Sequence, residues 1–354
     1  MVHTDCMHIG IDCRFAATHS GLGRYTREIV THMLQRNDPL RYTLFVRDTA
    51  EPWLAPLQSR ALIICADIPH YSFAEQLRFP ALIRRAGVDA LFSPHFNVPL
   101  RCPVPHVLTV HDLILHRYPN RAHRLKQMAY RFLMRSAVLR ARQIIAVSRF
   151  TAGELAQVYG ESVRTKTTVV YEGVSTLFRP VPQEQRRPVL EKYGLHKPYF
   201  LYVGNAKQHK NVQMLIDAYA SLQDSSRELV LMTGGCEHRN LRLAPGTVRI
   251  DGVPDHDLPA LYSGALACVS ATAYEGFGLP FAEALACGCR VIAPRMGAIP
   301  EVVRDHGVLV EPQTEAIAEA LAQIDALPVP PPTRFATWEE TAERVVQVLG
   351  AACF

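Results

Sequence analysis

The chain has 354 residues, more than a single α/β domain usually contains, and its length fits two domains of about 170 residues each. Hydrophobic residues make up 48% and charged residues 20%, proportions that are typical of folded globular proteins and exclude extensive disorder. The formal net charge of +5 is smaller than a dedicated nucleic-acid-binding protein usually carries, so we expect no nucleic-acid partner.

The N-terminal segment lacks the basic and apolar stretches of a signal peptide, and the chain contains no apolar run of about 18 residues, the length that spans a membrane. We therefore expect a cytoplasmic protein. The nine cysteines are scattered through apolar runs, which favours buried and reduced thiols. Cys287 and Cys289 have the wrong spacing for a zinc site, so we predict no structural metal.

Apolar runs of strand length alternate with helical patterns throughout the N-terminal half, which predicts a parallel α/β sheet. A glycine loop and a helix from about Arg24 follow the first run. The predicted strands of this half are 7–13, 42–46, 61–65, 90–92, 106–110, 143–147 and 168–170.

The segment from Leu113 to Gly153 contains no acidic residue, while arginine and lysine recur among its apolar residues. This pattern predicts a basic amphipathic helix. Anionic lipid attracts such a helix by about 1 kcal/mol per basic residue near the surface, which favours peripheral docking to the inner face of the cytoplasmic membrane through residues 117–142. A merely solvated helix face explains the same pattern equally well.

A polar, proline-rich stretch at 179–198 interrupts the alternation and predicts the join between two domains. The alternation then resumes and predicts a second doubly wound sheet, with strands at 199–203, 229–232, 266–269 and 290–293 and helices at 211–223, 279–287 and 313–325. Apolar residues recur at helical spacing from Trp338 to Leu349. We expect domains at 1–180 and 181–335 and a closing helix at 336–354.

The most specific motif lies at 274–288, directly after a predicted strand, where Glu275 and Glu283 are separated by seven residues. Pro280 suits the first turn of a helix, so the loop before it would direct backbone N–H groups toward a bound diphosphate. We place Glu283 in the first helical turn and Glu275 on the preceding loop. In those positions one carboxylate would bind hydroxyl groups at each end of a ligand.

Three other sequence patterns are less specific than this motif. Gly21 and Gly23 resemble a truncated dinucleotide-binding loop, but the third glycine and the later acidic residue are missing, which argues against NAD. Asp255 and Asp257 spell a metal-binding motif, yet they precede a predicted helix, and we interpret them as a helix cap. His111 follows a buried strand, at the sheet edge where α/β proteins bind ligands.

Several segments together resemble the retaining glycosyltransferases of family 4, and the resemblance covers nearly the whole chain. The 274–288 segment resembles the Glu-x7-Glu motif of that family. The other matching segments are 21–25, 109–113, 146–150, 203–211 and 338–342. The resemblance implies the GT-B fold, in which two Rossmann-like doubly wound parallel-sheet domains face a central cleft and the C-terminal helix crosses back to the N-terminal domain.

The resemblance also implies roles for individual residues. The catalytic residues are expected to be His111, Lys210 and Glu275, with His111 beside the transferred sugar. Within the C-terminal domain, Glu283 is expected on the ribose, Glu275 on the sugar, and Lys210 with the backbone of 277–279 on the diphosphate. The complete set expected to bind the donor is Gly21, Gly23, Asn205, His209, Lys210, Val253, Glu275, Gly276, Phe277, Gly278, Leu279 and Glu283.

Two departures from the family pattern stand out. His209 and Asn205 occupy positions where many relatives carry arginine, which leaves Lys210 as the permanent cation of that loop. Glu172 stands where relatives often have asparagine.

The expected reaction is hexosyl transfer with retention and without a metal or other cofactor, by front-face substitution in which the departing phosphate helps to deprotonate the acceptor. GDP-mannose is the first expectation for the donor, and a UDP-hexose is the second. The acceptor is expected to be a glycan or lipid-linked glycan of surface polysaccharide synthesis, bound by the N-terminal domain, with a soluble small acceptor as the alternative. A nucleotide-sugar epimerase, a pyridoxal-phosphate-dependent phosphorylase and a non-catalytic nucleotide-sugar binder remain as other readings.

Overall fold

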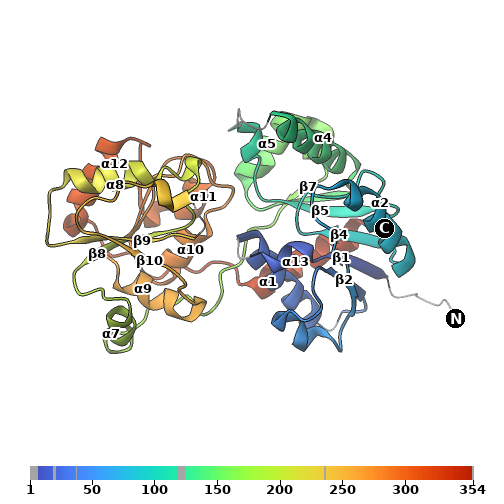
Figure 1. The fold of residues 1–354 in the computed structure, drawn as a ribbon, viewed down its shortest axis with the longest axis horizontal. Coiled ribbons are helices and arrows are strands. Elements are labelled where there is room, and N and C mark those ends of the chain that lie inside the picture. The colour runs from blue at the N-terminus through green and yellow to red at the C-terminus, as the bar shows by residue number, and fades with distance from the viewer. Residues whose placement is uncertain (1–6, 19–20, 37, 118–123, 235–236, 353–354) are drawn as a thin grey trace. The chain divides into compact units, whose positions relative to one another are not determined.

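The computed structural model describes residues 7–18, 21–36, 38–117, 124–234 and 237–352. The chain divides into two compact units, which we name the N-terminal unit (Met1–Gly173 with Trp338–Phe354) and the C-terminal unit (Val174–Thr337) (Figure 1). The closing helix thus belongs to the N-terminal unit, and the remaining boundary falls at 173/174, within the segment that follows the last strand of that unit.

The N-terminal unit is built on a seven-stranded parallel sheet in the order β3-β2-β1-β4-β5-β6-β7. Its central strands are short apolar segments buried on both faces, as a parallel sheet requires, and its outermost strands are partly exposed. Their bounds are β1 His8–Asp12, β2 Arg41–Val46, β3 Leu62–Cys65, β4 Ala90–Ser93, β5 His106–Val110, β6 Gln143–Ala146 and β7 Thr167–Val169.

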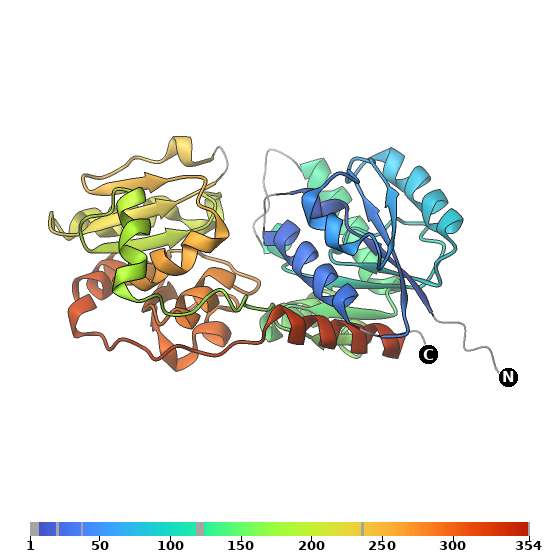
Figure 2. The same ribbon diagram turned by 90° about the horizontal axis from the view of Figure 1, so that it is seen from below.

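Helices cover both faces of this sheet (Figure 2). On one face α2, α4 and α5 share a core with strand residues such as Leu91 and Leu108. The alternate strand residues, such as Ile9 and Ile145, point to the opposite face, where α1 packs against α13. The helices are α1 Gly21–Gln35, α2 Phe73–Ala86, α3 Ile114–Arg117, α4 Arg124–Arg140, α5 Arg149–Tyr159, α6 Glu161–Arg164 and α13 Trp338–Ala352, with 3-10 turns η1 Arg14–Ala17 and η2 Pro52–Leu57.

A buried ionic cluster fixes the loops at the carboxyl edge of this sheet. Arg14 is fully buried and donates to Asp12 at 2.8 and 2.7 Å, and its Nη2 lies 2.8 Å from Oε1 of Glu75. Glu75 in turn accepts hydrogen bonds from the backbone N–H of Tyr71 at 2.7 Å and from the side chain of Asn97 at 2.8 Å. One carboxylate therefore holds the loops that follow β3 and β4.

The C-terminal unit is built on a six-stranded parallel sheet in the order β10-β9-β8-β11-β12-β13. Its strands are β8 Tyr199–Val203, β9 Glu228–Met232, β10 Thr247–Ile250, β11 Ala267–Val269, β12 Val291–Pro294 and β13 Val308–Val310. Its helices are α7 Gln183–Lys192, α8 Val212–Ser221, α9 Leu258–Gly264, α10 Leu279–Ala286, α11 Ile299–Val303 and α12 Thr314–Ala322, with 3-10 turns η4 Gln208–Lys210, η5 Glu237–Asn240, η6 Asp255–Asp257, η7 Arg304–His306 and η8 Ile324–Ala326. The prediction of two doubly wound parallel sheets is confirmed.

Three local features differ from what the sequence indicated. The proline-rich stretch after Arg179 contains helix α7, which packs against α9. The short strands β10 and β13 were not predicted. Asp257 makes no side-chain cap at the start of α9; its carboxylate accepts hydrogen bonds from Lys192 at 2.6 Å and Tyr193 at 2.7 Å, and so ties α7 to this turn.

Candidate functional site

In both sheets the order in which the chain adds strands reverses at a defined point, and parallel sheets bind ligands outside the carboxyl ends of the strands at that point. In the C-terminal unit the chain builds outward from β8 in one direction and from β11 in the other. In the N-terminal unit the equivalent pair is β1 and β4. We therefore expect a ligand-binding site in each unit at the loops that follow these strands.

In the C-terminal unit these loops bring Lys210 and Glu275 together. Lys210 lies in the loop after β8 and Glu275 in the loop after β11, and Lys210 Nζ donates to Glu275 Oε1 at 2.5 Å. Each side chain is 17% exposed, so both are partly exposed at the surface of the unit. Because an ammonium group has three N–H donors, Lys210 can hold Glu275 and still bind an anionic ligand.

The two loops are also joined through their backbones. The carbonyl of His209 accepts a hydrogen bond from the N–H of Ala273 at 2.8 Å. The backbone of Gly297 packs closely against the backbone of Glu275. The φ of Gly297 is +57°, and a Cβ atom at this position would lie 2.5 Å from the Glu275 carbonyl oxygen. Gly297 is a site residue that the sequence reasoning missed, because only its contact with a residue 22 positions earlier reveals the role.

The other residues of the basic loop have local roles. Burial, with the neighbouring charges of Lys210 and Lys207, lowers the pKa of His209 to about 4, so its imidazole is neutral at pH 7. The side-chain oxygen of Asn205 accepts a hydrogen bond from the N–H of Lys207 at 3.2 Å and forms a turn. Lys210 is therefore the cation of this loop that pairs with Glu275.

Helix α10 begins directly after the loop that carries Glu275. Gly278 precedes it with a φ of +95°, a conformation that favours glycine, and Pro280 lies in its first turn. The helix N-terminus therefore carries the positive end of the helix dipole at the loop of residues 274–278. Leu279 is the first helical residue, and Phe277 is buried at 5% exposure.

Glu283 does not lie in the first turn of α10, contrary to the expectation. The helix starts at Leu279, which places Glu283 one turn further in, at 2% exposure. There its Oε2 accepts a hydrogen bond from the buried hydroxyl of Tyr262 at 3.1 Å. The carboxylate of Glu283 is thus held in the interior of the unit, while that of Glu275 is partly exposed.

Gly276 and Val253, which also belong to the expected donor-binding set, follow different strands of the same sheet. Gly276 follows Glu275 in the same loop. Val253 follows β10, which is the outermost strand of the sheet and is separated from β8 by β9. Their contact with a donor stays a prediction.

In the N-terminal unit the sheet edge positions His111 directly after β5. The Nε2 atom of His111 lies 2.9 Å from the carbonyl oxygen of Pro94, and its Nδ1 lies 3.1 Å from Oε1 of Glu172. A carbonyl only accepts, so both ring nitrogens carry hydrogen when Glu172 is ionised. Burial lowers the pKa of His111, but the hydrogen bond and charge of Glu172 outweigh it, and the pKa is raised above its ordinary value.

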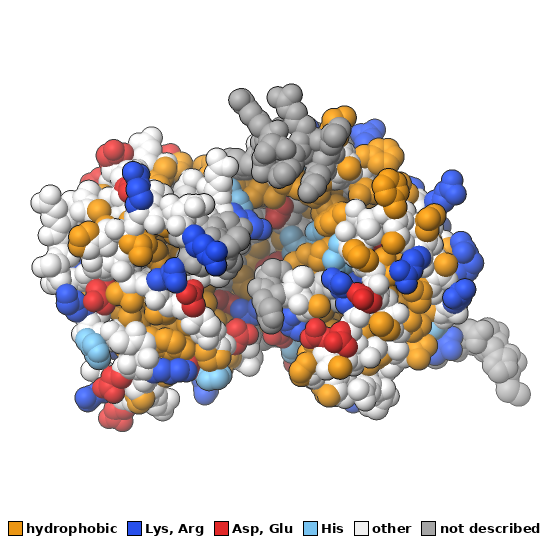
Figure 3. All heavy atoms as spheres, viewed as in Figure 1, with side chains coloured by type: hydrophobic (Ala, Val, Ile, Leu, Met, Phe, Trp, Pro, Cys, Tyr) orange, Lys and Arg blue, Asp and Glu red, His pale blue; other side chains and the backbone are white. Residues whose placement is uncertain are grey.

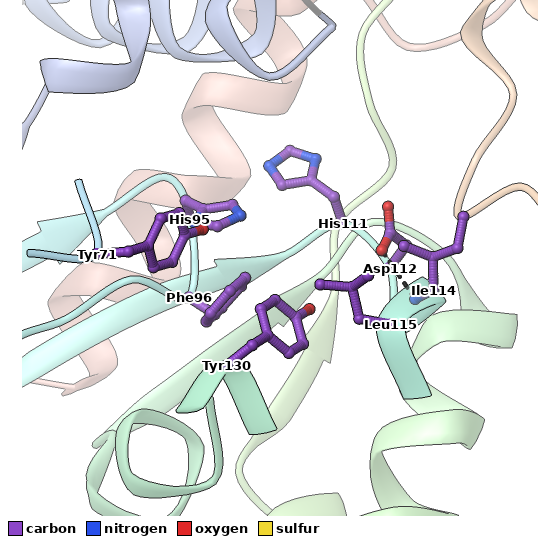
Figure 4. Close-up of a pocket in the computed structure, with 8 residues that line it drawn as sticks. All are labelled: Tyr71, His95, Phe96, His111, Asp112, Ile114, Leu115 and Tyr130. Atoms are coloured by element: carbon purple, nitrogen blue, oxygen red, sulfur yellow. Dashed lines mark hydrogen bonds between the residues drawn. The ribbon is translucent and has the colours of Figure 1, made fainter. Parts of the chain in front are cut away.

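A cavity of about 160 Å³ opens beside His111 (Figure 4). Its side chains come from four segments: the loop after β3, the loop after β4, the end of β5 with α3, and α4. Aromatic rings form one side, and Asp112 with two aliphatic side chains forms the other. The lining residues are Tyr71, His95, Phe96, His111, Asp112, Ile114, Leu115 and Tyr130.

The two glycines near the start of the chain lie in the first turn of α1 rather than in a loop before it. A Cβ atom on Gly23 would lie 2.0 Å from the carbonyl oxygen of Thr18, so this glycine allows two backbone segments to approach closely. A Cβ atom on Gly21 would meet open space. The geometry gives Gly23 a structural role, and donor binding by either glycine stays a prediction.

Over the residues that the structure describes, no group of three histidine, cysteine, aspartate or glutamate side chains is arranged to hold a metal ion. Within the same residues, no helix is both long enough and apolar enough to cross a membrane.

Comparison with known proteins identifies both halves of the chain. The model of the family described as Glycosyltransferase Family 4 matches residues 19–177, and the model described as Glycosyl transferases group 1 matches residues 197–325. O-antigen chain mannosyltransferase B of Escherichia coli is 31% identical over 65% of this chain. O-antigen chain mannosyltransferase RfbU of Salmonella typhimurium is 26% identical over 73% of this chain.

These matches span 64% of the Escherichia coli protein and 71% of the Salmonella protein. Among solved structures, Anabaena HepE in complex with UDP-glucose superposes with a TM-score of 0.72 at 16% identity and covers 98% of both chains. WaaG, a glycosyltransferase involved in lipopolysaccharide biosynthesis, superposes with a TM-score of 0.73 at 15% identity, covering 97% of this chain and 98% of its own. At these identities the likeness shows the fold.

Proposed function

Because the chain belongs to glycosyltransferase family 4, we propose that it transfers a hexose, with retention, from a nucleotide diphosphate sugar to a glycan or lipid-linked glycan acceptor. The observation that carries this proposal is the Lys210–Glu275 pair. It places a partly exposed cation and a partly exposed carboxylate side by side at the carboxyl edge of the C-terminal sheet, next to the N-terminus of α10. This combination suits a ligand that carries a diphosphate and a polyol.

Lys210 would bind the diphosphate and stabilise the negative charge that develops on it as the bond to the sugar breaks. Glu275 would accept hydrogen bonds from sugar hydroxyls and hold the ring in place. The acceptor oxygen then bonds to the anomeric carbon on the face from which the diphosphate departs. The acceptor proton passes to the departing phosphate oxygen, so no carboxylate nucleophile is required.

We further propose that the donor is GDP-mannose and that no metal takes part. The names of the O-antigen mannosyltransferases to which the chain is similar support mannose. The fixed charges of Lys210 and of the α10 N-terminus supply the electrostatic stabilisation for which a metal would otherwise be needed. The fold shared with HepE, which was solved with UDP-glucose, keeps a UDP-hexose as the second candidate donor.

The acceptor is proposed to bind the N-terminal unit, in surface polysaccharide synthesis. We also propose peripheral contact with anionic lipid through α4. The exposed face of this helix presents Met128 and Phe132 at 66% and 61% exposure, and Arg131 and Arg135 lie on the same face. Hydrophobic and basic side chains adjoin one another on the visible surface of this unit (Figure 3).

The direct test is calorimetric titration of the protein with GDP-mannose, UDP-glucose, UDP-N-acetylglucosamine, GDP and UDP, in the presence of EDTA. We expect selective micromolar binding of GDP-mannose. Binding of UDP-sugars alone would keep the transferase and replace the donor. Binding that appears only after Mg²⁺ or Mn²⁺ is added would contradict metal-independent transfer.

Product analysis separates the alternatives. A transferase forms a new glycosidic bond when an acceptor is present, whereas an epimerase converts the nucleotide sugar without one. A non-catalytic binder would bind the donor and neither transfer nor hydrolyse it.

A further inference from the structure

The aromatic side chains, size and charge of the cavity beside His111 indicate which class of acceptor group it binds. We propose that it binds an uncharged pyranose ring at the end of the acceptor, with the apolar face of the ring on Tyr130, the edge of the ring against Phe96, and a hydroxyl group on Asp112. This assignment rests on the proposed function, because it deepens the acceptor half of that reaction.

The aromatic side of the cavity is built as a corner. The rings of Phe96 and Tyr130 lie 4.7 Å apart at an interplanar angle of 75°, and Tyr71 lies 6.3 Å from Phe96 on the far side. Phe96 is 4% exposed and cannot turn away from the cavity without disturbing the core. One face of a pyranose ring presents C–H groups, which pack favourably against the electron-rich faces of such rings.

The size of the cavity fits one sugar. The volume of about 160 Å³ is on the order of that of a single sugar ring. An extended apolar chain would need a longer groove. The opposite side supplies polar contact: Asp112 Oδ1 accepts the N–H of Ile114 at 3.0 Å, and its second oxygen makes no hydrogen bond with a described residue.

The charge of the cavity argues for a neutral ligand. Among the described residues that line it, none is lysine or arginine. The charge of His111 is balanced by Glu172 at 3.1 Å, and burial together with the neighbouring His111 and His70 keeps the pKa of His95 well below its ordinary value, so that ring is neutral. Among the described lining residues, Asp112 is then the charge that no ion pair balances, and it attracts hydroxyl donors while repelling phosphate. Because His111 lines the same cavity, the bound sugar lies beside the residue expected at the transferred hexose.

The test is saturation-transfer NMR of the full chain with three probes: methyl α-mannopyranoside, methyl α-glucopyranoside and mannose 6-phosphate. We expect signals from a neutral glycoside and none from the sugar phosphate. Tyr130→Ala should weaken glycoside binding about tenfold, the scale of one aromatic contact, and Asp112→Asn by about tenfold or more. Phe73→Ala removes a ring that is 92% exposed and outside the lining, and should leave the signals unchanged.

Calorimetric binding of the donor reports on the C-terminal unit in the same variants. Donor affinity should be preserved in Tyr130→Ala and Asp112→Asn, because neither residue belongs to the expected donor-binding set. Glycoside signals that survive both substitutions, or tighter binding of mannose 6-phosphate than of either glycoside, would overturn the cavity assignment and leave the donor reaction intact. Glycoside binding by a protein that binds no nucleotide sugar would instead overturn the proposed function.

Discussion

At the scale of single residues, Lys210 carries the most specific expectation. Lys210→Ala should lower kcat/KM by roughly 100-fold or more, because the loss of one charge-stabilising donor costs about 3 kcal/mol in the transition state. Steady-state transfer from the identified donor measures this. Lys207→Ala removes an exposed lysine from the same loop and serves as the matched control, with activity near the unmodified level. Near-normal turnover of Lys210→Ala would contradict the role of Lys210 in stabilising the departing diphosphate.

The charge of His111 is a second expectation at this scale. Both ring nitrogens face acceptors, Pro94 and Glu172, and the other titratable side chains facing the ring are Asp112, His95 and Tyr25. We expect an NMR titration to give His111 a pKa above its ordinary value. In Glu172→Gln the pKa should fall, because the main interaction that raises it is lost. His116, whose pKa burial lowers, is an internal reference that should not move.

The raised pKa of His111 also predicts how the stability of the N-terminal unit depends on pH. A histidine whose pKa is raised by folding stabilises the protein below its unfolded pKa, and this contribution disappears as pH rises through the folded pKa. The free energy of unfolding of the N-terminal unit should therefore decrease over that interval. Glu172→Gln should lose most of this slope. A slope that the substitution leaves unchanged would assign the pH dependence to another group.

At the scale of elements, the Arg14–Asp12–Glu75 cluster determines how the loops after β3 and β4 are held. Glu75→Ala should destabilise the N-terminal unit by about 3–5 kcal/mol, because it leaves a buried guanidinium with one partner fewer. Denaturant unfolding measures this. Glu161→Gln alters a fully exposed Arg164–Glu161 pair and should have no measurable effect. A small effect of Glu75→Ala would mean that Asp12 alone suffices for Arg14.

Helix α4 is the element proposed to contact lipid, and its structure limits the original expectation. Arg117 pairs with the buried Glu154, and Arg140 donates to the carbonyl of Pro99 at 3.1 Å, so both are engaged within the unit. Arg131 likewise donates to the carbonyl of His116 at 3.1 Å, so the face left for a membrane consists of Met128, Phe132 and Arg135. Residues 118–123, part of the expected basic segment, lie outside the described residues.

Cosedimentation with vesicles tests that face. We expect binding to vesicles rich in phosphatidylglycerol, weaker binding at high salt, and none to phosphatidylcholine. Phe132→Ala should weaken binding about tenfold or more, because burial of such a side chain contributes about 1.5–3 kcal/mol. Val329→Ala truncates an exposed apolar residue of the C-terminal unit and is the control. Binding that is equal for both lipids, or unaffected by Phe132→Ala, would contradict docking through α4.

At the scale of the whole molecule, the sequence predicts those elements that the local hydrophobic pattern determines, and it does not predict features that depend on contacts between distant segments. Most strands of both sheets were predictable because they are apolar on both faces and alternate with helices. Strands β10 and β13 were not, because they are short, partly exposed strands at the two edges of their sheet. Helix α7 was not, because it is polar and contains Pro188, and contacts with Asp257 and α9 hold it in place. The burial of Glu283 was missed because its spacing from Glu275 does not say where the helix begins. The cavity was missed because its walls come from four distant segments.

The two units each have their own sheet and core, so they should unfold in separate steps. The chain contains two tryptophans, Trp53 and Trp338, and both belong to the N-terminal unit, so tryptophan fluorescence reports on that unit alone. Leu349 in α13 is 1% exposed, and Leu349→Ala should destabilise the N-terminal unit by about 2–5 kcal/mol.

The calorimetric transition of the C-terminal unit should stay in place in that variant, since α13 packs on α1 and β6. Gln347→Ala alters an exposed residue of the same helix and should move neither transition. If Leu349→Ala shifted both transitions together, the units would unfold as one cooperative body. In that case the stability of the donor-binding loops would depend on the closing helix, and substitutions in α13 would alter donor affinity as well as the stability of the N-terminal unit.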